Sequence, residues 1–318
     1  MAFRIHRGPE EIDSQFGPCA LTIGNFDGLH AGHRRIVRRA VELARANGWK
    51  ASALTFHPHP AAIVAPERAP QLLTTPEERA QLMEEEGIEQ VLILPFTHAT
   101  SLIAPGAFAR DVIAGLLGAR AVLVGDNFRF GHLHAGGIQL LEEIGGRYGF
   151  AVEAIPAVRM RGRVVSSSEI RRLIAAGRVS LACRFLERPY TLAGEVVRGH
   201  GIGSQKTVPT LNLAARHSLL PATGVYVTRT REPETGRMWP SVTNLGYRPT
   251  FDGSGISIET FLLTPLAGDS PRAIRVEFLL RLRDERKFPD AAALKSQILK
   301  DVARAQKYFR LAAAMRRS

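Results

Sequence analysis

The sequence predicts an α/β domain with a doubly wound parallel sheet over residues 1–186, followed by an antiparallel β domain with a terminal helix over residues 187–318. Three observations support this division. A chain of 318 residues is long enough for about two domains. Its first half alternates short apolar runs with segments of helical period, which is typical of a parallel sheet. After Glu187, short apolar runs follow one another between turn residues, as in a barrel or a sandwich.

In the first half we expect strands over 19–24, 51–56, 90–95, 120–125 and 150–156, and helices over about 33–47, 76–86, 105–117 and 137–148. The first helix shows the pattern most clearly, because Ile36, Ala40 and Ala44 recur at helical spacing while arginines occupy the other face. Repeated strand–helix–strand units give right-handed crossovers, and ligands of such sheets bind at the carboxyl ends of the strands.

In the second half we expect strands over 190–198, 224–231, 240–246, 256–263 and 274–282, with turns such as 252–255 between them. A final helix over about 290–315 carries Leu294, Ile298, Val302 and Ala305 along one side. The sequence contains no internal repeat, so two unlike domains are expected to join near residues 186–189.

Composition narrows the class of protein. With 45% hydrophobic and 23% charged residues, the chain belongs among globular proteins. Cys19 and Cys183 are its only cysteines, which excludes a disulfide scaffold and a four-cysteine zinc site. The charged N-terminus is unlike a signal peptide, and the most apolar later stretch, 112–124, is interrupted by Arg120 and is too short to cross a bilayer. We therefore expect a cytoplasmic protein with no membrane partner.

The formal charge of +12 favours anionic ligands. Most of the excess is C-terminal, because 21 basic and 12 acidic residues follow Leu186. A basic domain can bind nucleic acid by neutralising phosphates. Here, however, the basic residues are scattered and only six of 42 are lysine, so nucleotides are the expected partners and nucleic acid is not.

The most informative segment is 22–33, which runs from the first strand into the first helix. Glycines such as Gly28 let the backbone approach a ligand, and the free N–H groups at a helix start bind phosphate. His30 and His33 could both face that phosphate and, protonated or hydrogen-bonded, stabilise charge on it as pyrophosphate leaves. The alternative is a surface polar pair or a partial metal site.

A second segment, 124–131, ends the fourth strand and should lie at the same edge of the sheet. Asp126, Asn127, Phe128 and Arg129 offer groups suited to a planar ring system. The alternative is a turn that ends the strand and contributes phenylalanines to the core.

A third segment, 166–172, opens a helix with Ser166 and Ser167, which serine caps alone would explain. One turn later, Arg171 could neutralise the β- and γ-phosphates of a nucleotide.

Together with Thr55-Phe56-His57-Pro58-His59-Pro60, these segments resemble the nucleotidyltransferase superfamily with its His-x-Gly-His signature. More closely, residues 1–186 resemble the N-terminal module of bacterial bifunctional riboflavin kinase/FAD synthetases, which transfers AMP from ATP to FMN. The resemblance implies that His30 and His33 contact the ATP phosphates. It also implies a binding role for Gly24, Asn25, Phe26, Asp27, Gly28, Gly32, Asp126, Asn127, Phe128, Arg129, Ser166 and Ser167.

The second half carries its own candidate site. Gly201 and Gly203 lie in a glycine-rich loop that could wrap phosphates, or could be an ordinary turn. Thr210 and Asn212, two residues apart on an extended segment, point the same way and could reach one Mg²⁺, or could simply face solvent. Glu259 is the only acid in an alternating apolar run, so it is a candidate base or an exposed strand residue.

The Pro-Thr-x-Asn element at 209–212 and the Glu-Thr pair at 259–260 resemble the riboflavin kinase module, a β-barrel, over residues 187–318. The resemblance implies that Thr210 and Asn212 bind magnesium with ATP, and that Glu259 activates the ribityl 5′-hydroxyl of riboflavin. It also places Gly201, Gly203 and Thr207 in the cofactor-binding loop. The chain departs from the family at Ile202 and Ser204, where basic residues are usual.

The sequence thus predicts a bifunctional enzyme that converts riboflavin to FMN and FMN to FAD, with ATP as co-substrate and Mg²⁺ as cofactor. Two other readings stay open at this point. One is an adenylyltransferase for another phosphorylated substrate with a non-catalytic barrel. The other is a basic RNA-binding protein built on a nucleotidyltransferase fold.

Overall fold

The computed structural model describes residues 3–14, 16–197, 210–215, 219–248, 255–266 and 268–315. The chain separates into two compact units, Met1–Ser167 (the sheet unit) and Ser168–Ser318 (the barrel unit). Contacts therefore group residues 168–186 with the barrel, whereas the sequence pattern grouped them with the sheet.

The sheet unit is built on six parallel strands in the order β1-β4-β3-β2-β5-β6. The strands are β1 (Arg4–His6), β2 (Cys19–Ile23), β3 (Lys50–His57), β4 (Gln90–Pro95), β5 (Ala119–Gly125) and β6 (Ala151–Ile155). The five longer strands match the expected ranges to within a residue or two. Only β1, at the edge of the sheet, was not expected.

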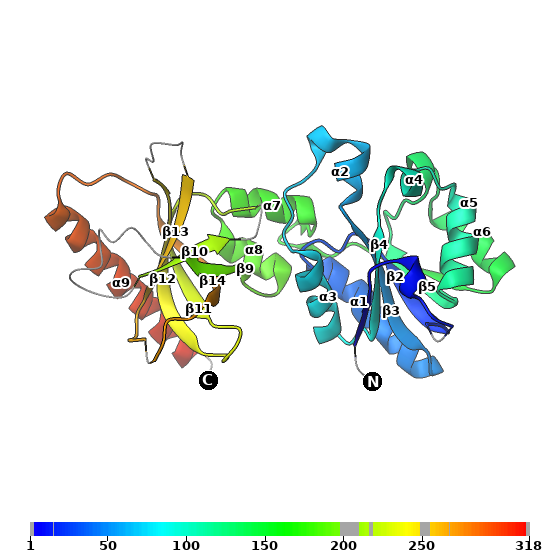
Figure 1. Cartoon of the computed structure of the whole chain (residues 1–318), viewed down its shortest axis with the longest axis horizontal. Coiled ribbons are helices and arrows are strands. Elements are labelled where there is room, and N and C mark those ends of the chain that lie inside the picture. The colour runs from blue at the N-terminus through cyan, green and yellow to red at the C-terminus, as the bar shows by residue number, and fades with distance from the viewer. Residues whose placement is uncertain are drawn as a thin grey trace. The chain divides into compact units, whose positions relative to one another are not determined.

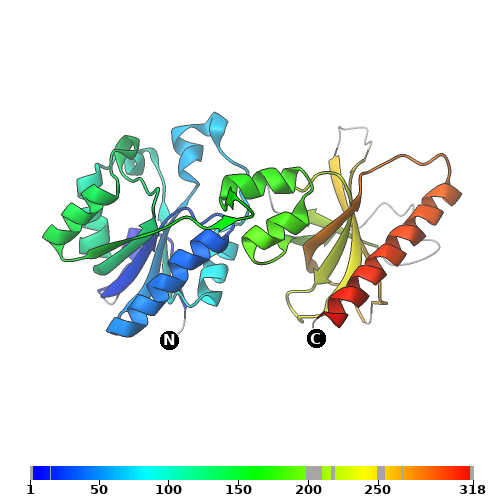
Figure 2. The same ribbon diagram turned by 180° about the vertical axis from the view of Figure 1, so that it is seen from behind.

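Helices cover both faces of this sheet (Figure 1, Figure 2). One face packs against α1 (Ala31–Asn47) and α3 (Pro76–Glu85), and the other against η3 (Phe108–Leu116), a π-helix, and α6 (Ile138–Tyr148). This arrangement confirms the doubly wound α/β prediction. Shorter elements complete the unit: η1 (Pro9–Glu11), α2 (Pro60–Val64), η2 (Pro66–Arg68), α4 (His98–Ser101), α5 (Pro105–Ala107), η4 (His132–His134), β7 (Arg159–Met160) and β8 (Arg163–Val164).

The barrel unit closes six strands in the order β10-β13-β12-β11-β14-β9, which selects a barrel over a sandwich. Neighbouring strands are antiparallel throughout. The strands are β9 (Tyr190–Val197), β10 (Thr210–Ala215), β11 (Gly224–Arg231), β12 (Met238–Arg248), β13 (Gly255–Leu262) and β14 (Ala273–Arg283). Five of them match expected strands, and β10 falls on the segment expected only to be extended.

Three helices accompany the barrel strands in the described part of this half of the chain. The terminal helix α9 (Ala291–Ala314) runs along its outside in both views (Figure 1, Figure 2), with Ala305 buried against Val225 and Val242. Helices α7 (Ser167–Ala175) and α8 (Val179–Leu186) precede β9. From α8, the Ser180 hydroxyl donates a hydrogen bond to the carbonyl of Leu279 at 2.9 Å. No helix in the described part of the chain is both long and apolar enough to cross a membrane.

A row of hydroxyl groups fills part of the barrel interior. Its members are fully buried and hydrogen-bonded to one another at 2.8 to 3.0 Å: Thr228, Thr230, Ser241, Thr243 and Thr260. Because side chains alternate along a strand, the residues next to this row face outward. Two of them are Asn244 on β12 and Glu259 on β13.

Candidate functional site

The two motifs expected at one edge of the sheet do begin there. The loop 24–30 follows β2, the loop 126–130 follows β5, and these two strands are parallel neighbours. The strand that flanks β2 on its other side, β3, ends at the motif 55–60. From that motif, His59 places its Nε2 atom 3.4 Å from the side-chain nitrogen of Asn25. Carboxyl ends of three adjacent strands thus build one polar edge, where ligands of such folds bind.

Hydrogen bonds with backbone N–H groups hold the loop after β2 in an unusual conformation. Phe26 is buried at a φ of 48°, a region that side chains disfavour, and Gly28 has a φ of 80°. The Asp27 carboxylate is buried and accepts hydrogen bonds from the backbone N–H groups of Leu73 and Thr74 at 3.0 and 3.1 Å. The N–H of Gly28 donates to the Thr74 hydroxyl at 3.0 Å. Asp27 therefore shapes the loop from within.

The histidine pair lies where this loop enters α1. His30 caps the helix, since its Nδ1 accepts the backbone N–H of His33 at 3.3 Å. A neutral ring that accepts at Nδ1 carries its proton on Nε2, which is then a hydrogen-bond donor. The two rings stack with centroids 3.6 Å apart and planes 15° from parallel. A Cβ atom on Gly32 would lie 3.1 Å from His30 Cε1, so glycine leaves room for the ring.

The surroundings of His33 disfavour its protonated form. Burial, together with the neighbouring charges of His30 and Arg79, holds the pKa of His33 well below its ordinary value. The Nδ1 atom of His33 is buried and has no hydrogen-bond partner among the residues that the structure describes. Of the two states considered from the sequence, protonated or hydrogen-bonding, the low pKa argues against a protonated His33, and a hydrogen bond from its ring to phosphate stays a prediction.

The loop after β5 presents polar groups beside an aromatic stack. Asp126, Asn127 and Arg129 are exposed, whereas Phe128 is half-buried and stacks on the buried Phe130 at 5.6 Å. Phe130 is thus the core residue that the alternative reading expected, and Phe128 borders the surface. The Asp126 carboxylate accepts the backbone N–H of Ala157 at 3.1 Å.

The serine segment reaches the same loop. Ser167 donates its hydroxyl proton to the backbone carbonyl of Asp27 at 2.9 Å, and Ser166 is half-buried beside it in sequence. Arg171 lies one turn further along α7, in the barrel unit, and its proposed contact with phosphates stays a prediction.

The candidate kinase residues share the outer wall of the barrel. Glu259 on β13 pairs directly with Asn212 on β10 and with Asn244 on β12, so the three form one cross-strand row. Thr210, two residues before Asn212, pairs with Phe261 and is exposed. Asn244 was missed from the sequence, because its pairing with Glu259 depends on strand register. Gly201, Gly203 and Thr207 lie outside the described residues.

The chemistry of this wall fits magnesium. Thr210 and Asn212 offer oxygen atoms, the ligands that Mg²⁺ prefers. Within the described ranges, no three His, Cys, Asp or Glu residues gather in a way that could hold a metal ion. A magnesium ion at this wall would therefore take most of its ligands from water and phosphate, as it does in many phosphoryl-transfer sites.

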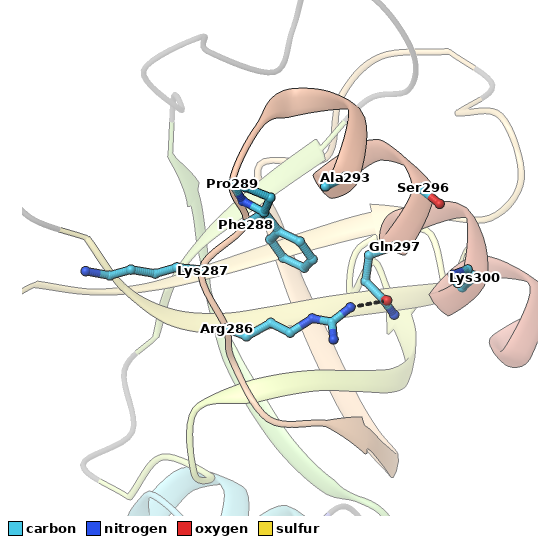
Figure 3. A pocket seen from close by; sticks show the side chains of 8 residues that line it. All are labelled: Arg286, Lys287, Phe288, Pro289, Ala293, Ser296, Gln297 and Lys300. Carbon is cyan, nitrogen blue, oxygen red and sulfur yellow. Dashed lines mark hydrogen bonds between the residues drawn. The ribbon is translucent and has the colours of Figure 1, made fainter.

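A cavity of about 380 Å³ lies between the segment 286–289 and the start of α9 (Figure 3). Phe288 forms part of its lining, with the guanidinium groups of Arg283 and Arg286 at 5.6 and 4.9 Å from the ring centre. Arg286 also donates to the side-chain oxygen of Gln297 across the cavity. With Lys287 and Lys300 among the other lining residues, the cavity is basic.

Comparison with known proteins assigns a family to each half of the chain. Residues 12–169 match the family model for FAD synthetase, and residues 186–309 match that for riboflavin kinase. The bifunctional riboflavin kinase/FMN adenylyltransferase of Pseudomonas fluorescens is 36% identical over 95% of this chain and 97% of its own length. The protein of the same description from Escherichia coli K12 is 32% identical over 92% and 93%. The chain belongs to this family.

Members of the bifunctional riboflavin kinase/FMN adenylyltransferase family carry two activities, and both matched domains are present here. The chain therefore phosphorylates riboflavin to FMN and adenylylates FMN to FAD, with ATP as the co-substrate of both domain families. An experimental structure described as a macrolide-efflux protein from Streptococcus pneumoniae has a TM-score of 0.85 and 24% identity over 96% of this chain and 99% of its own. At that identity the likeness shows the fold alone.

Proposed function

We propose that AMP transfer to FMN takes place where β2 meets α1, and that riboflavin is phosphorylated on the barrel wall formed by β10, β13 and β12. The stacked pair His30 and His33 at the start of α1 carries the first assignment. The cross-strand row of Asn212, Glu259 and Asn244 carries the second.

In the sheet unit, the free N–H groups at the start of α1 would hold the ATP phosphates, with His30 Nε2–H donating to the α-phosphate. A phosphate oxygen of FMN attacks the α-phosphorus, the bond to the β-phosphate oxygen breaks, and pyrophosphate leaves. Imidazole N–H donors stabilise the charge that develops, and the low pKa of His33 makes its ring a neutral donor. We place the nucleotide along the loop residues Gly24, Asn25, Phe26, Asp27 and Gly28 and along Gly32 in the first turn of α1.

The exposed loop after β5 is the proposed place for the flavin. Phe128 offers a half-buried ring beside the polar Asp126, Asn127 and Arg129, which together suit a planar ring with polar edges. The phosphate contact expected of Arg171 stays a prediction, whereas Ser166 and Ser167 are proposed to contact the phosphates of the nucleotide. The Ser167 hydrogen bond to the backbone of Asp27 supports this placement, because it ties the serine segment to the nucleotide loop.

In the barrel unit, Glu259 is the proposed general base. Its carboxylate takes the proton of the ribityl 5′-hydroxyl as that oxygen attacks the γ-phosphorus, and ADP leaves. Asn212 and Asn244 flank Glu259 and would orient it. Thr210 and Asn212 would hold a magnesium ion, which when bound offsets the negative charge of the ATP phosphates.

A time course with riboflavin, ATP and magnesium tests both assignments, because HPLC separates riboflavin, FMN and FAD. We expect FMN to appear first and FAD to follow. Glu259→Gln should lose FMN formation by more than about 100-fold while still converting added FMN to FAD. His33→Ala should do the reverse, and loss of both steps in either variant would overturn the division of roles. The cytoplasmic location expected from the sequence stays a prediction.

A further inference from the structure

A buried arginine lies behind the loop 24–30, which is the proposed nucleotide loop. Arg79 is on the face of α3 that packs toward the sheet, and only 1% of its surface is exposed. Its Nη1 atom donates to the Thr55 hydroxyl at 2.9 Å and approaches the Phe56 carbonyl at 3.4 Å. Its Nε atom is buried with no hydrogen-bond partner among the described residues. Because burying a guanidinium carries a large desolvation penalty, its presence here needs a reason besides packing.

Thr55 connects Arg79 to the nucleotide loop by hydrogen bonds. Its hydroxyl accepts from Arg79 and donates its own proton to the backbone carbonyl of Asn25 at 3.2 Å. Asn25 is the second residue of the loop that follows β2. A hydrogen-bonded chain therefore runs from α3 through the end of β3 to the loop that leads to the histidine pair.

Arg79 also interacts with the nucleotide loop through charge. The carboxylate of Asp27 and the guanidinium of Arg79 attract each other, while burial lowers the pKa of Arg79. Both side chains are 1% exposed, so their charges are poorly screened by solvent. Arg79 also places a positive charge near His33, which lowers the pKa of His33 in addition to burial and the interaction with His30.

We infer that Arg79 is a positioning residue for adenylyl transfer, which fixes the loop 24–30 through Thr55 and Asp27 and thereby the placement of His30 and His33. It acts from behind the loop and contacts neither substrate. The inference rests on the proposed site of adenylyl transfer and adds a residue that no motif in this segment singles out.

The direct test replaces Arg79 by Met, which keeps the length of the side chain and removes its charge and donors. We expect Arg79→Met to slow FAD formation from added FMN by about 10- to 100-fold, since displacing a reacting group by about 1 Å has effects of this size. FMN formation from riboflavin by the barrel unit should stay within about twofold, which makes it an internal control in the same chain.

A matched control separates positioning from a loss of packing. Met83 lies one turn further along α3 and is fully buried, but it makes no hydrogen bond to the loop. Met83→Ala should lower the melting temperature yet leave FAD formation within about threefold well below that temperature. If Met83→Ala slows FAD formation as much as Arg79→Met does, Arg79 is only a packing residue and the inference fails.

Two further readouts keep the inference testable if Arg79→Met folds poorly. Thr55→Val interrupts the hydrogen-bonded chain with almost no change in volume, and should slow FAD formation in the same direction. Combining Thr55→Val with Arg79→Lys should slow FAD formation little more than the more severe of the two single variants. The reason is that residues linked by one chain of hydrogen bonds have non-additive effects. If the two single losses of FAD formation multiply in the double variant, Arg79 and Thr55 act independently and the inference fails.

The second readout is the titration of His33, followed by NMR of its ring protons and assigned by their disappearance in His33→Gln. Removing the positive charge of Arg79 should raise the pKa of His33, whereas Arg79→Lys should leave it close to that of the unaltered protein. An unchanged titration in Arg79→Met would refute the charge contact. If the unaltered protein makes no FAD from FMN, the proposed site fails; if it does and Arg79→Met matches it, only this inference fails.

Discussion

Gly32→Ala should separate the stability of the sheet unit from its activity. Gly32 lies in the first turn of α1, where alanine is the better helix former by about 0.5–1 kcal/mol. The new Cβ atom would meet His30 Cε1 and Nδ1 at 3.1 and 3.2 Å, so the ring must move by a few tenths of an ångström. That movement weakens the cap that His30 provides to His33 N–H, which is worth about 1 kcal/mol. The two effects nearly cancel in the free energy of unfolding.

The rate of FAD formation has no second effect that offsets the movement of the His30 ring. A ring displaced by about half an ångström should slow FAD formation by about 10-fold, with FMN formation unchanged. The assay is the rate of FAD formation from FMN and ATP, with urea unfolding of the same preparation. Gly146→Ala is the matched control, because Gly146 is an exposed glycine of α6 whose Cβ would contact nothing within 4 Å. Wild-type FAD formation by Gly32→Ala would refute the argument that glycine makes room for His30.

Three further predictions concern stability. Thr243→Val removes the hydrogen bonds to the buried hydroxyls of Thr260 and Thr228, of which Thr228 keeps its contact with Ser241, and should lower the free energy of unfolding by about 1–3 kcal/mol in urea titrations. Asp301→Ala removes the buried partner that Arg283 Nε binds at 2.9 Å, and should cost about 3 kcal/mol, with Asp301→Asn milder, measured the same way. Because the pKa of His33 is lower in the folded chain, the unfolded chain binds more protons, so stability should fall as the pH drops below about 6.5 and this slope should flatten in His33→Gln, followed by thermal unfolding.

Elements whose pattern is local were predicted well. Strand β4 lies on its expected range, and α1 begins only two residues before its expected start. The short β1 was missed because three residues cannot show an alternation, and it exists by pairing with β4. The segment 105–117 was expected to form one helix and instead divides into α5 and the π-helix η3, where Leu117 N–H bonds the Val112 carbonyl. Apolar residues four or five apart fit either form, so the pattern could not distinguish them.

The same distinction applies to the candidate sites: residues close together in sequence were predicted, and contacts between distant segments were not. His30 and His33 are close in sequence and one of them caps the helix that holds the other, so their spacing alone indicated a pair. Arg79 reaches Asn25 only through Thr55, across 54 residues of sequence, and nothing local links them. A weak signal did exist: Arg79 lies four residues before Met83, on the stripe of α3 that faces the core.

The two proposed sites meet the negative charge of a phosphate in different ways. The sheet unit offers neutral donors: backbone N–H groups at the start of α1, and the imidazole of His33, whose pKa is held low by burial, His30 and Arg79. The barrel wall offers the carboxylate of Glu259, which repels a phosphate unless a cation lies between them, with the neutral side chains of Asn212 and Asn244 on either side. Loss of a donor in the sheet unit removes an attraction. Replacing Glu259 by glutamine also weakens a repulsion, so Glu259→Gln should lose kcat for FMN formation without losing affinity for ATP.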